Sequence, residues 1–151
     1  MAADEATILL HPIGHVVRSV EGGFGVEPSG PEDIDALRAA PARLVMRPEV
    51  ADALVGLAPG SDLLVLTYFH RASRDTLQVH PRGDLSRPLR GVFTTRSPSR
   101  PNPIGVTSAR VLAVEGLVVT VLGLDALHGS PVLDIKSLSA AFDGPYGPGE
   151  P

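Results

Sequence analysis

Residues 106–123, VTSARVLAVEGLVVTVLG, decide the fold class of this chain. Two valine-rich runs flank Glu115-Gly116, a pair that suits a tight turn between antiparallel strands. This stretch therefore predicts a β-hairpin. Upstream, the apolar run Asp62–His70 (DLLVLTYFH) combines β-branched and aromatic residues, which is typical of a buried central strand.

The rest of the chain predicts short strands and little helix. Glycine and proline together make about a fifth of the chain, 16 and 15 of 151 residues, and both interrupt long helices. Apolar spacing predicts one helix within 47–57 (RPEVADALVGL) and a short one at 33–39, inside a long loop. Further short strands are expected at 7–19, 43–46, 77–80, 89–95 and 131–136.

Most of these strands have no helix between them, which argues against a doubly wound α/β fold. We therefore predict a mainly β fold: a small closed or strongly curved β-barrel with one or two short helices. Residues 1–142 are assigned to this domain. Residues 143–151 are a Gly/Pro-rich tail.

Composition excludes several classes of protein. The chain has no cysteine, which removes disulfides, thiolate metal sites and cysteine nucleophiles. No run approaches the ~20 apolar residues of a membrane span, and the acidic N-terminus does not resemble a secretory signal, so we expect a cytoplasmic protein. The net charge of −4 argues against a simple cationic RNA binder but leaves a local basic patch open. His11 and His15 flank a Pro-Gly pair that prevents a helical metal site, so no metal is expected.

The segment with the strongest chemical signal is Arg96–Gly105, RSPSRPNPIG. Three prolines restrict its backbone and exclude a helix. Arg96, Ser97, Arg100 and Asn102 would thus be presented on a stiff loop, which lowers the entropic cost of binding a ligand. The alternative is a purely structural turn across the mouth of the barrel.

Two other segments are more ambiguous. Residues 124–136 (LDALHGSPVLDIK) carry Asp125, His128, Asp134 and Lys136 in apolar surroundings, yet the last two could form an ordinary surface ion pair. Residues 68–71 (YFHR) could line a pocket or stack a purine. They could equally be core aromatics followed by solvated polar residues.

Taken together, these blocks closely resemble the TrmO-like family of tRNA methyltransferases, also called the TsaA-like domain. The matching stretches, in family order, are HPIGHVVRS (11–19), DLLVLTYFHRA (62–72), VHPRGD (79–84), GVFTTRSPSRPNPIGVTSARVL (91–112) and GLDALHGSPVLDIKSL (123–138). They extend from about His11 to Phe142.

The resemblance implies a barrel that binds S-adenosylmethionine (SAM) without a Rossmann fold. It also implies a homodimer that methylates the exocyclic nitrogen of threonylcarbamoyladenosine in tRNA. By motif, the implied cofactor-binding residues are Phe69, His70, Arg96, Ser97, Arg100, Pro101, Asn102, Pro103, Gly105, Asp125 and Leu127. A weakly nucleophilic acceptor nitrogen must also lose a proton, and for this general base we hypothesise His70 first and Asp134 second. Arg71, His128 and Lys136 are expected to contact substrate.

The sequence departs from the family pattern at two places. His128 stands where an acidic residue is common, and Ser137-Leu138 replace Pro-Tyr. The chain also stops after the barrel, whereas bacterial members often continue into a C-terminal domain. Two alternatives therefore stay open: an N-methyltransferase for a small metabolite, and a non-catalytic cofactor-binding regulatory module.

Overall fold

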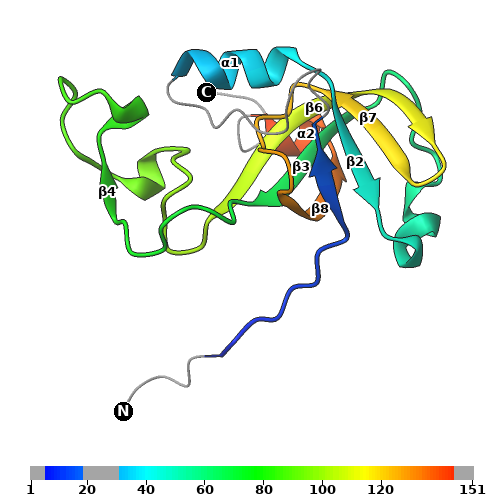
Figure 1. Ribbon diagram of the computed structural model, residues 1–151, viewed down its shortest axis with the longest axis horizontal. Helices are drawn as coiled ribbons and strands as arrows, with labels where there is room; N and C mark the ends of the chain where they lie inside the picture. The colour runs from blue at the N-terminus through cyan, green and yellow to red at the C-terminus, as the bar shows by residue number, and fades with distance from the viewer. Residues whose placement is uncertain (1–5, 19–30, 145–151) are drawn as a thin grey trace.

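The hairpin centred on Gly116 is present in the computed structural model of the chain, which describes residues 6–18 and 31–144 (Figure 1). Strand β6, Ile104–Glu115, runs antiparallel to β7, Val118–Leu122, and Glu115 lies opposite Val118. Gly116 has a φ of +61°, a backbone conformation that glycine adopts without steric cost. The prediction of a hairpin is confirmed.

Six antiparallel strands form a closed ring in the order β1-β2-β7-β6-β3-β8. The four strands not yet described are β1 Gly14–Val17, β2 Ala42–Met46, β3 Asp62–Tyr68 and β8 Pro131–Ser137. The ring closes because β8 pairs with β3 on one side and with β1 on the other. The prediction of a mainly β fold with a closed or strongly curved sheet and a few short helices is confirmed.

Side chains along each strand point alternately into and out of the ring, and the inward ones fill its interior. Strand β3 lies between β6 and β8, as its apolar sequence predicted, and its inward side chains Leu63 and Val65 are fully enclosed. The outward residues Leu64, Leu66 and Tyr68 are half-buried and Asp62 is exposed, so β3 is central without being covered on both faces. The buried core is completed by Val16, Ala42, Leu44, Met46, Ala109, Val111, Val119, Val121, Leu124, Ala126 and Val132. Burial of each large aliphatic side chain contributes about 1.5–3 kcal/mol.

Short helices lie at the edges of the ring. Helix α1 spans Pro31–Ala39, close to the predicted 33–39, and α2 spans Ala140–Asp143. The helix predicted within 47–57 is a 3₁₀ helix, η1, over Pro48–Leu54. Among the described residues, no helix is long and apolar enough to cross a membrane.

The prediction of a strand at 89–95 is wrong. Only β5, Arg90–Gly91, is extended there, paired with β4, Gln78–Val79, and the 3₁₀ turn η3, Val92–Thr94, follows. The hydroxyl groups of Thr94 and Thr95 donate hydrogen bonds back to the carbonyl oxygens of the turn, an alternative to sheet pairing. Leu89 and Phe93 are consequently exposed.

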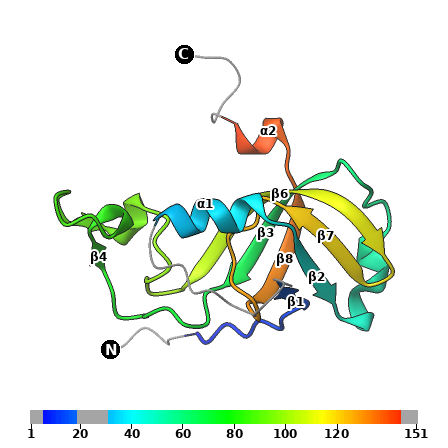
Figure 2. The ribbon, with the colours of Figure 1, turned by 45° about the horizontal axis from the view of Figure 1, so that its top comes forward.

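Residues 69–103 leave the ring between β3 and β6 and form a separate lobe, which also contains the 3₁₀ turn η2, Pro81–Gly83 (Figure 1). Helix α1 extends from the ring toward this lobe in both views (Figure 2). The strand predicted at 7–19 is confined to β1, while residue 19 lies outside the described residues. Of the tail predicted at 143–151, residues 145–151 also lie outside them.

Candidate functional site

A cleft of about 1450 Å³ lies where the 69–103 lobe, α1 and the first residues of β6 meet. The cleft brings together parts of the chain that are far apart in sequence. Its lining includes six of the residues singled out by sequence: Phe69, Arg96, Ser97, Arg100, Gly105 and Asp125. It therefore joins the proline-rich loop to the 124–136 segment, as expected if both belong to one site.

Arg100 stabilises the proline-rich loop from within. Its guanidinium donates hydrogen bonds to the carbonyl oxygens of Thr95 at 3.2 Å, Ser97 at 3.1 Å and Val92 at 3.0 Å. Its backbone N–H donates to the carbonyl oxygen of Ser73 at 3.0 Å. Because these contacts occupy both terminal nitrogens, Arg100 orders the loop before any ligand arrives.

The aromatic wall of the cleft depends on a glycine. The Phe69 ring packs against Gly105, where an added Cβ would lie 2.4 Å from ring atom Cζ. The backbone N–H of Phe69 donates to the carbonyl oxygen of Pro103 at 2.8 Å, which ties the wall to the loop. Only glycine at position 105 leaves room for this arrangement.

A carboxylate is held at the inner end of the cleft. The Asp125 side chain is half-buried and accepts a short hydrogen bond from the hydroxyl of Thr107, a buried residue of β6. Both residues line the cleft. The carboxylate is thus held by β6 and contributes to the wall of the cleft.

Arg18 was missed by the sequence analysis and lies behind Asp125. Its side chain is buried, and its guanidinium donates to the carbonyl oxygens of Leu124 at 2.5 Å, Ala126 at 2.6 Å and Leu37 at 3.0 Å. Burial lowers the pKa of Arg18, while the negative charge of Asp125 acts in the opposite direction. The signal that sequence offered was a single arginine ending the apolar run 16–18.

Several predicted residues lie near the cleft but not in its wall. His70 and Arg71 are exposed in the turn after β3. Asn102 is exposed, and its side-chain oxygen accepts a hydrogen bond from Arg74 at 3.3 Å. His128 accepts a hydrogen bond at Nδ1 from the backbone N–H of Arg18 at 3.2 Å. The remaining ones, Pro101, Pro103 and Leu127, are also absent from the lining.

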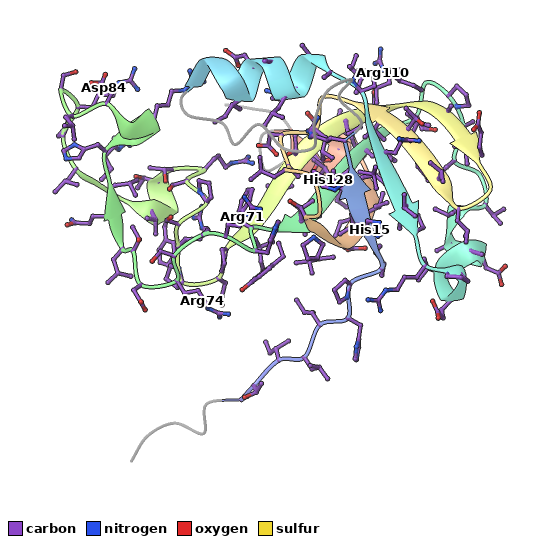
Figure 3. All side chains as sticks on the ribbon, in the orientation of Figure 1. His15, Arg71, Arg74, Asp84, Arg110 and His128 are labelled. Atoms are coloured by element: carbon purple, nitrogen blue, oxygen red, sulfur yellow. The ribbon has the colours of Figure 1, made fainter. Side chains whose placement is uncertain are left out.

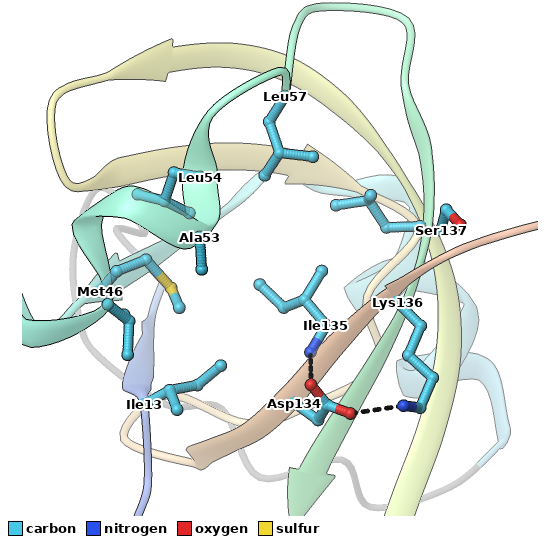
Figure 4. A pocket seen from close by; sticks show the side chains of 11 residues that line it. Ile13, Met46, Ala53, Leu54, Leu57, Asp134, Ile135, Lys136 and Ser137 are labelled. Atoms are coloured by element: carbon cyan, nitrogen blue, oxygen red, sulfur yellow. Dashed lines mark hydrogen bonds and ion pairs between the residues drawn. The ribbon is translucent and has the colours of Figure 1, made fainter.

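Asp134 and Lys136 are not brought to this cleft. They line a separate hollow of about 330 Å³ beside η1, whose other walls are mainly apolar (Figure 4). The two side chains form an ion pair at 2.8 Å, and this hydrogen bond raises the pKa of Lys136. Asp134 also accepts a hydrogen bond from the backbone N–H of Ile135 at 2.9 Å. The geometry is that of the surface ion pair considered above.

Positive charge concentrates on the 69–103 lobe despite the negative net charge of the chain. Seven of the twelve arginines lie there, against only two of the seventeen acidic residues. Arg71 and Arg74 lie near the base of the lobe and Asp84 near its far end (Figure 3). The basic members are Arg71, Arg74, Arg82, Arg87, Arg90, Arg96 and Arg100. Total charge concealed this local patch.

Residues 20–144 match the model of the tRNA-methyltransferase O N-terminal domain. The chain belongs to this family. An S-adenosyl-L-methionine-binding protein of Archaeoglobus fulgidus is 42% identical over 136 residues, covering 90% of this chain and 93% of the relative. The human tRNA (adenine(37)-N6)-methyltransferase is 35% identical over 155 residues, covering 99% of this chain and 34% of that enzyme.

The fold is that of solved members of the TrmO family. A crystal structure of TrmO superposes with a TM-score of 0.70 at 29% identity, over 95% of this chain and 61% of that chain. This chain therefore matches nearly the full length of the archaeal relative but about a third of the human enzyme. The family resemblance inferred from the sequence motifs is confirmed.

Proposed function

We propose that this chain is a SAM-dependent methyltransferase whose substrate is the exocyclic nitrogen of threonylcarbamoyladenosine in tRNA. Family membership supports the methyl transfer and the tRNA substrate, as does the similarity to the S-adenosyl-L-methionine-binding protein and to the human tRNA methyltransferase. The observation that carries the proposal is the cleft itself. It places a prearranged loop and a fixed carboxylate beside an arginine-rich lobe.

The cleft residues match the polar and aromatic groups of SAM. Within the described part of the chain, the Arg96 side chain donates one hydrogen bond, from Nη1 to the carbonyl oxygen of Val106 at 3.1 Å, and its other donors suit a carboxylate. Asp125 suits an ammonium or hydroxyl group, and Phe69 offers a face for a purine ring. We assign Arg96 rather than Arg100 to the ligand carboxylate, because Arg100 is engaged by the loop.

SAM supplies a sulfonium-activated methyl group, and an in-line transfer requires the acceptor to be held close to it. The chain contributes orientation through the loop and through Phe69. The acceptor nitrogen must also lose a proton. We assign this proton transfer to His70, which does not line the cleft itself but directly follows the cleft residue Phe69 in the turn after β3. Intact turnover of His70→Ala at saturating SAM would exclude it.

The lobe supports a polyanionic substrate. The side chains of Arg82 and Arg90 form no hydrogen bond or ion pair with any other described residue, and both are exposed. Exposed guanidinium groups that line a cleft bind phosphates well. We therefore expect a tRNA backbone to lie along the lobe, with its target base at the cleft. A tRNA substrate also agrees with the cytoplasmic location expected from the sequence.

We further propose that the active form is a homodimer. Phe93 and Leu85 of the lobe are 83% and 80% exposed, and both line the cleft. Large apolar side chains at a binding cleft are typical of surfaces that a second chain covers. Analytical ultracentrifugation tests this directly: a strictly monomeric enzyme with full activity would contradict it.

The deciding experiment is methyl transfer to tRNA. Purified protein is incubated with methyl-labelled SAM and tRNA that carries threonylcarbamoyladenosine, with tRNA lacking that modification as the control. Label in the modified nucleoside alone supports the proposal. Binding of SAM without label in either tRNA would instead favour the small-molecule methyltransferase or the regulatory module considered above.

A further inference from the structure

One buried guanidinium joins two walls of the cleft. Arg18 donates to the carbonyl oxygens on either side of Asp125, those of Leu124 and Ala126. Its guanidinium also donates to the carbonyl oxygen of Leu37 in α1. The loop that carries Asp125 and the helix are thus held by the same side chain.

Both walls contribute ligand-facing residues. Helix α1 supplies Ile34, Asp35 and Arg38 to the lining, and the loop supplies Asp125. A reciprocal contact strengthens the junction, since Arg38 Nε donates to the carbonyl oxygen of Gly123 at 3.0 Å and the Gly123 N–H donates back at 3.1 Å. A displacement of Arg18 would therefore shift two walls of the cleft, α1 and the loop that carries Asp125.

An apolar side chain at position 18 could neither donate to these carbonyl oxygens nor place a positive charge near Asp125. Burying a guanidinium costs free energy that a methionine of similar length avoids. Three hydrogen bonds and the adjacent Asp125 charge compensate that cost. The cost of burying Arg18 is explained if its role is to hold Asp125 in position and to balance its charge.

We propose that Arg18 is a positioning residue that acts through Asp125: it fixes the carboxylate for ligand binding and sets the spacing of α1 from the loop. The inference deepens the proposed function, because the ligand is taken to be SAM. Arg18 does not line the cleft. Its effect is therefore indirect, and coupling to Asp125 distinguishes it from general stabilisation.

A double-mutant cycle tests this coupling. SAM affinity is measured by calorimetry for Arg18→Met, Asp125→Asn and the double variant. We expect each single variant to lose about tenfold or more in affinity, and the double variant to bind within about twofold of Asp125→Asn. Losses that multiply, or an Arg18→Met affinity within about twofold of wild type, would overturn the proposal.

Two further variants keep the test decisive. Arg18→Lys keeps the charge but cannot bridge three carbonyl oxygens, so we expect an intermediate loss; it replaces Arg18→Met in the cycle if that variant does not fold. Arg110→Met removes an arginine paired with exposed Asp62 on the ring and should leave SAM affinity unchanged. Equal losses in Arg110→Met and Arg18→Met would overturn the proposal.

Hydrogen exchange separates this inference from the proposed function. If folded wild-type protein binds no SAM, the proposed function fails, whereas the positioning role is still measurable without ligand. Arg18→Lys should then accelerate amide exchange in 124–128 and 34–38 while leaving β6 unchanged. Unaltered exchange in both segments would contradict the role of Arg18.

Discussion

The Phe69 ring occupies the space that a side chain at position 105 would need. Gly105 lies on β6 opposite Thr67, while Phe69 begins the lobe, so this contact sets how the lobe leaves the ring. It also fixes the aromatic wall of the cleft. The requirement for glycine at 105 is thus a requirement of the site as much as of the strand.

Gly105→Ala should damage ligand binding more than stability. The added methyl group displaces the Phe69 ring, and we expect SAM affinity to fall by about tenfold or more. Gly91→Ala is the matched control, because no heavy atom lies within 4 Å of a Cβ built there. Calorimetry on both variants checks this, and equal affinities would remove Phe69 from the cofactor site.

Arg100→Met should loosen the proline-rich loop. Its guanidinium satisfies three carbonyl oxygens, and hydrogen bonds to a charged group contribute about 1.5–3 kcal/mol each before solvent exposure reduces them. We expect a loss of about 1–3 kcal/mol in the free energy of unfolding in urea, together with weaker SAM binding. Arg82→Met, an exposed lobe residue, serves as the control for stability. If Arg100→Met were as stable as that control, the loop would not depend on this contact.

Removing charge from the lobe should weaken tRNA binding. For Arg82→Ala/Arg90→Ala, we expect lower tRNA affinity and a slope of log K against log salt that is shallower by about one per lost phosphate contact. Fluorescence anisotropy at several salt concentrations measures both. Arg43→Ala/Arg47→Ala removes two exposed arginines outside the lobe and should change neither. An identical slope for both double variants would argue against tRNA contact by the lobe.

The Asp62–Arg110 pair should make a small contribution to acid sensitivity. The hydrogen bond from Arg110, at 2.8 Å, lowers the pKa of Asp62 from its usual 3.8. A carboxyl group whose pKa is lower in the folded state stabilises the fold at pH values above its pKa in the unfolded state. This stabilisation is lost as the pH falls through the lowered pKa of the folded state. Asp62→Asn should therefore show a smaller drop in stability between about pH 5 and pH 2. Denaturation at these pH values, with Asp52→Asn as control, checks this.

The parts of the fold that follow from local pattern were predictable. The hairpin around Gly116 and strand β3 have apolar runs and turn residues that favour one structure. The segment 89–95 has similar composition, yet threonine hydroxyl groups bond back to its own carbonyl oxygens and turn it away from the sheet. Competition between such local hydrogen bonds and sheet pairing leaves no periodic pattern of apolar residues in the sequence.

The site could be predicted where prolines fix the backbone, but not where tertiary packing determines the position of a side chain. The proline-rich loop lies at the cleft, as its stiffness suggested. Asp134 is only nine residues from Asp125, but β8 carries it to the hollow beside η1. Arg18 could not be predicted, because an arginine at the end of a strand is ordinarily exposed to solvent. Only the closed ring brings it to the carbonyl oxygens of Leu124 and Ala126, which accept its hydrogen bonds.

The claim on which the account depends is that the cleft beside the proline-rich loop binds SAM. Titration of SAM into the folded protein by isothermal calorimetry tests it most directly, with Arg96→Ala measured in parallel. We predict saturable heat for the wild type and an affinity at least about tenfold lower for the variant. No heat from folded wild-type protein, or equal affinities for the two proteins, would contradict it.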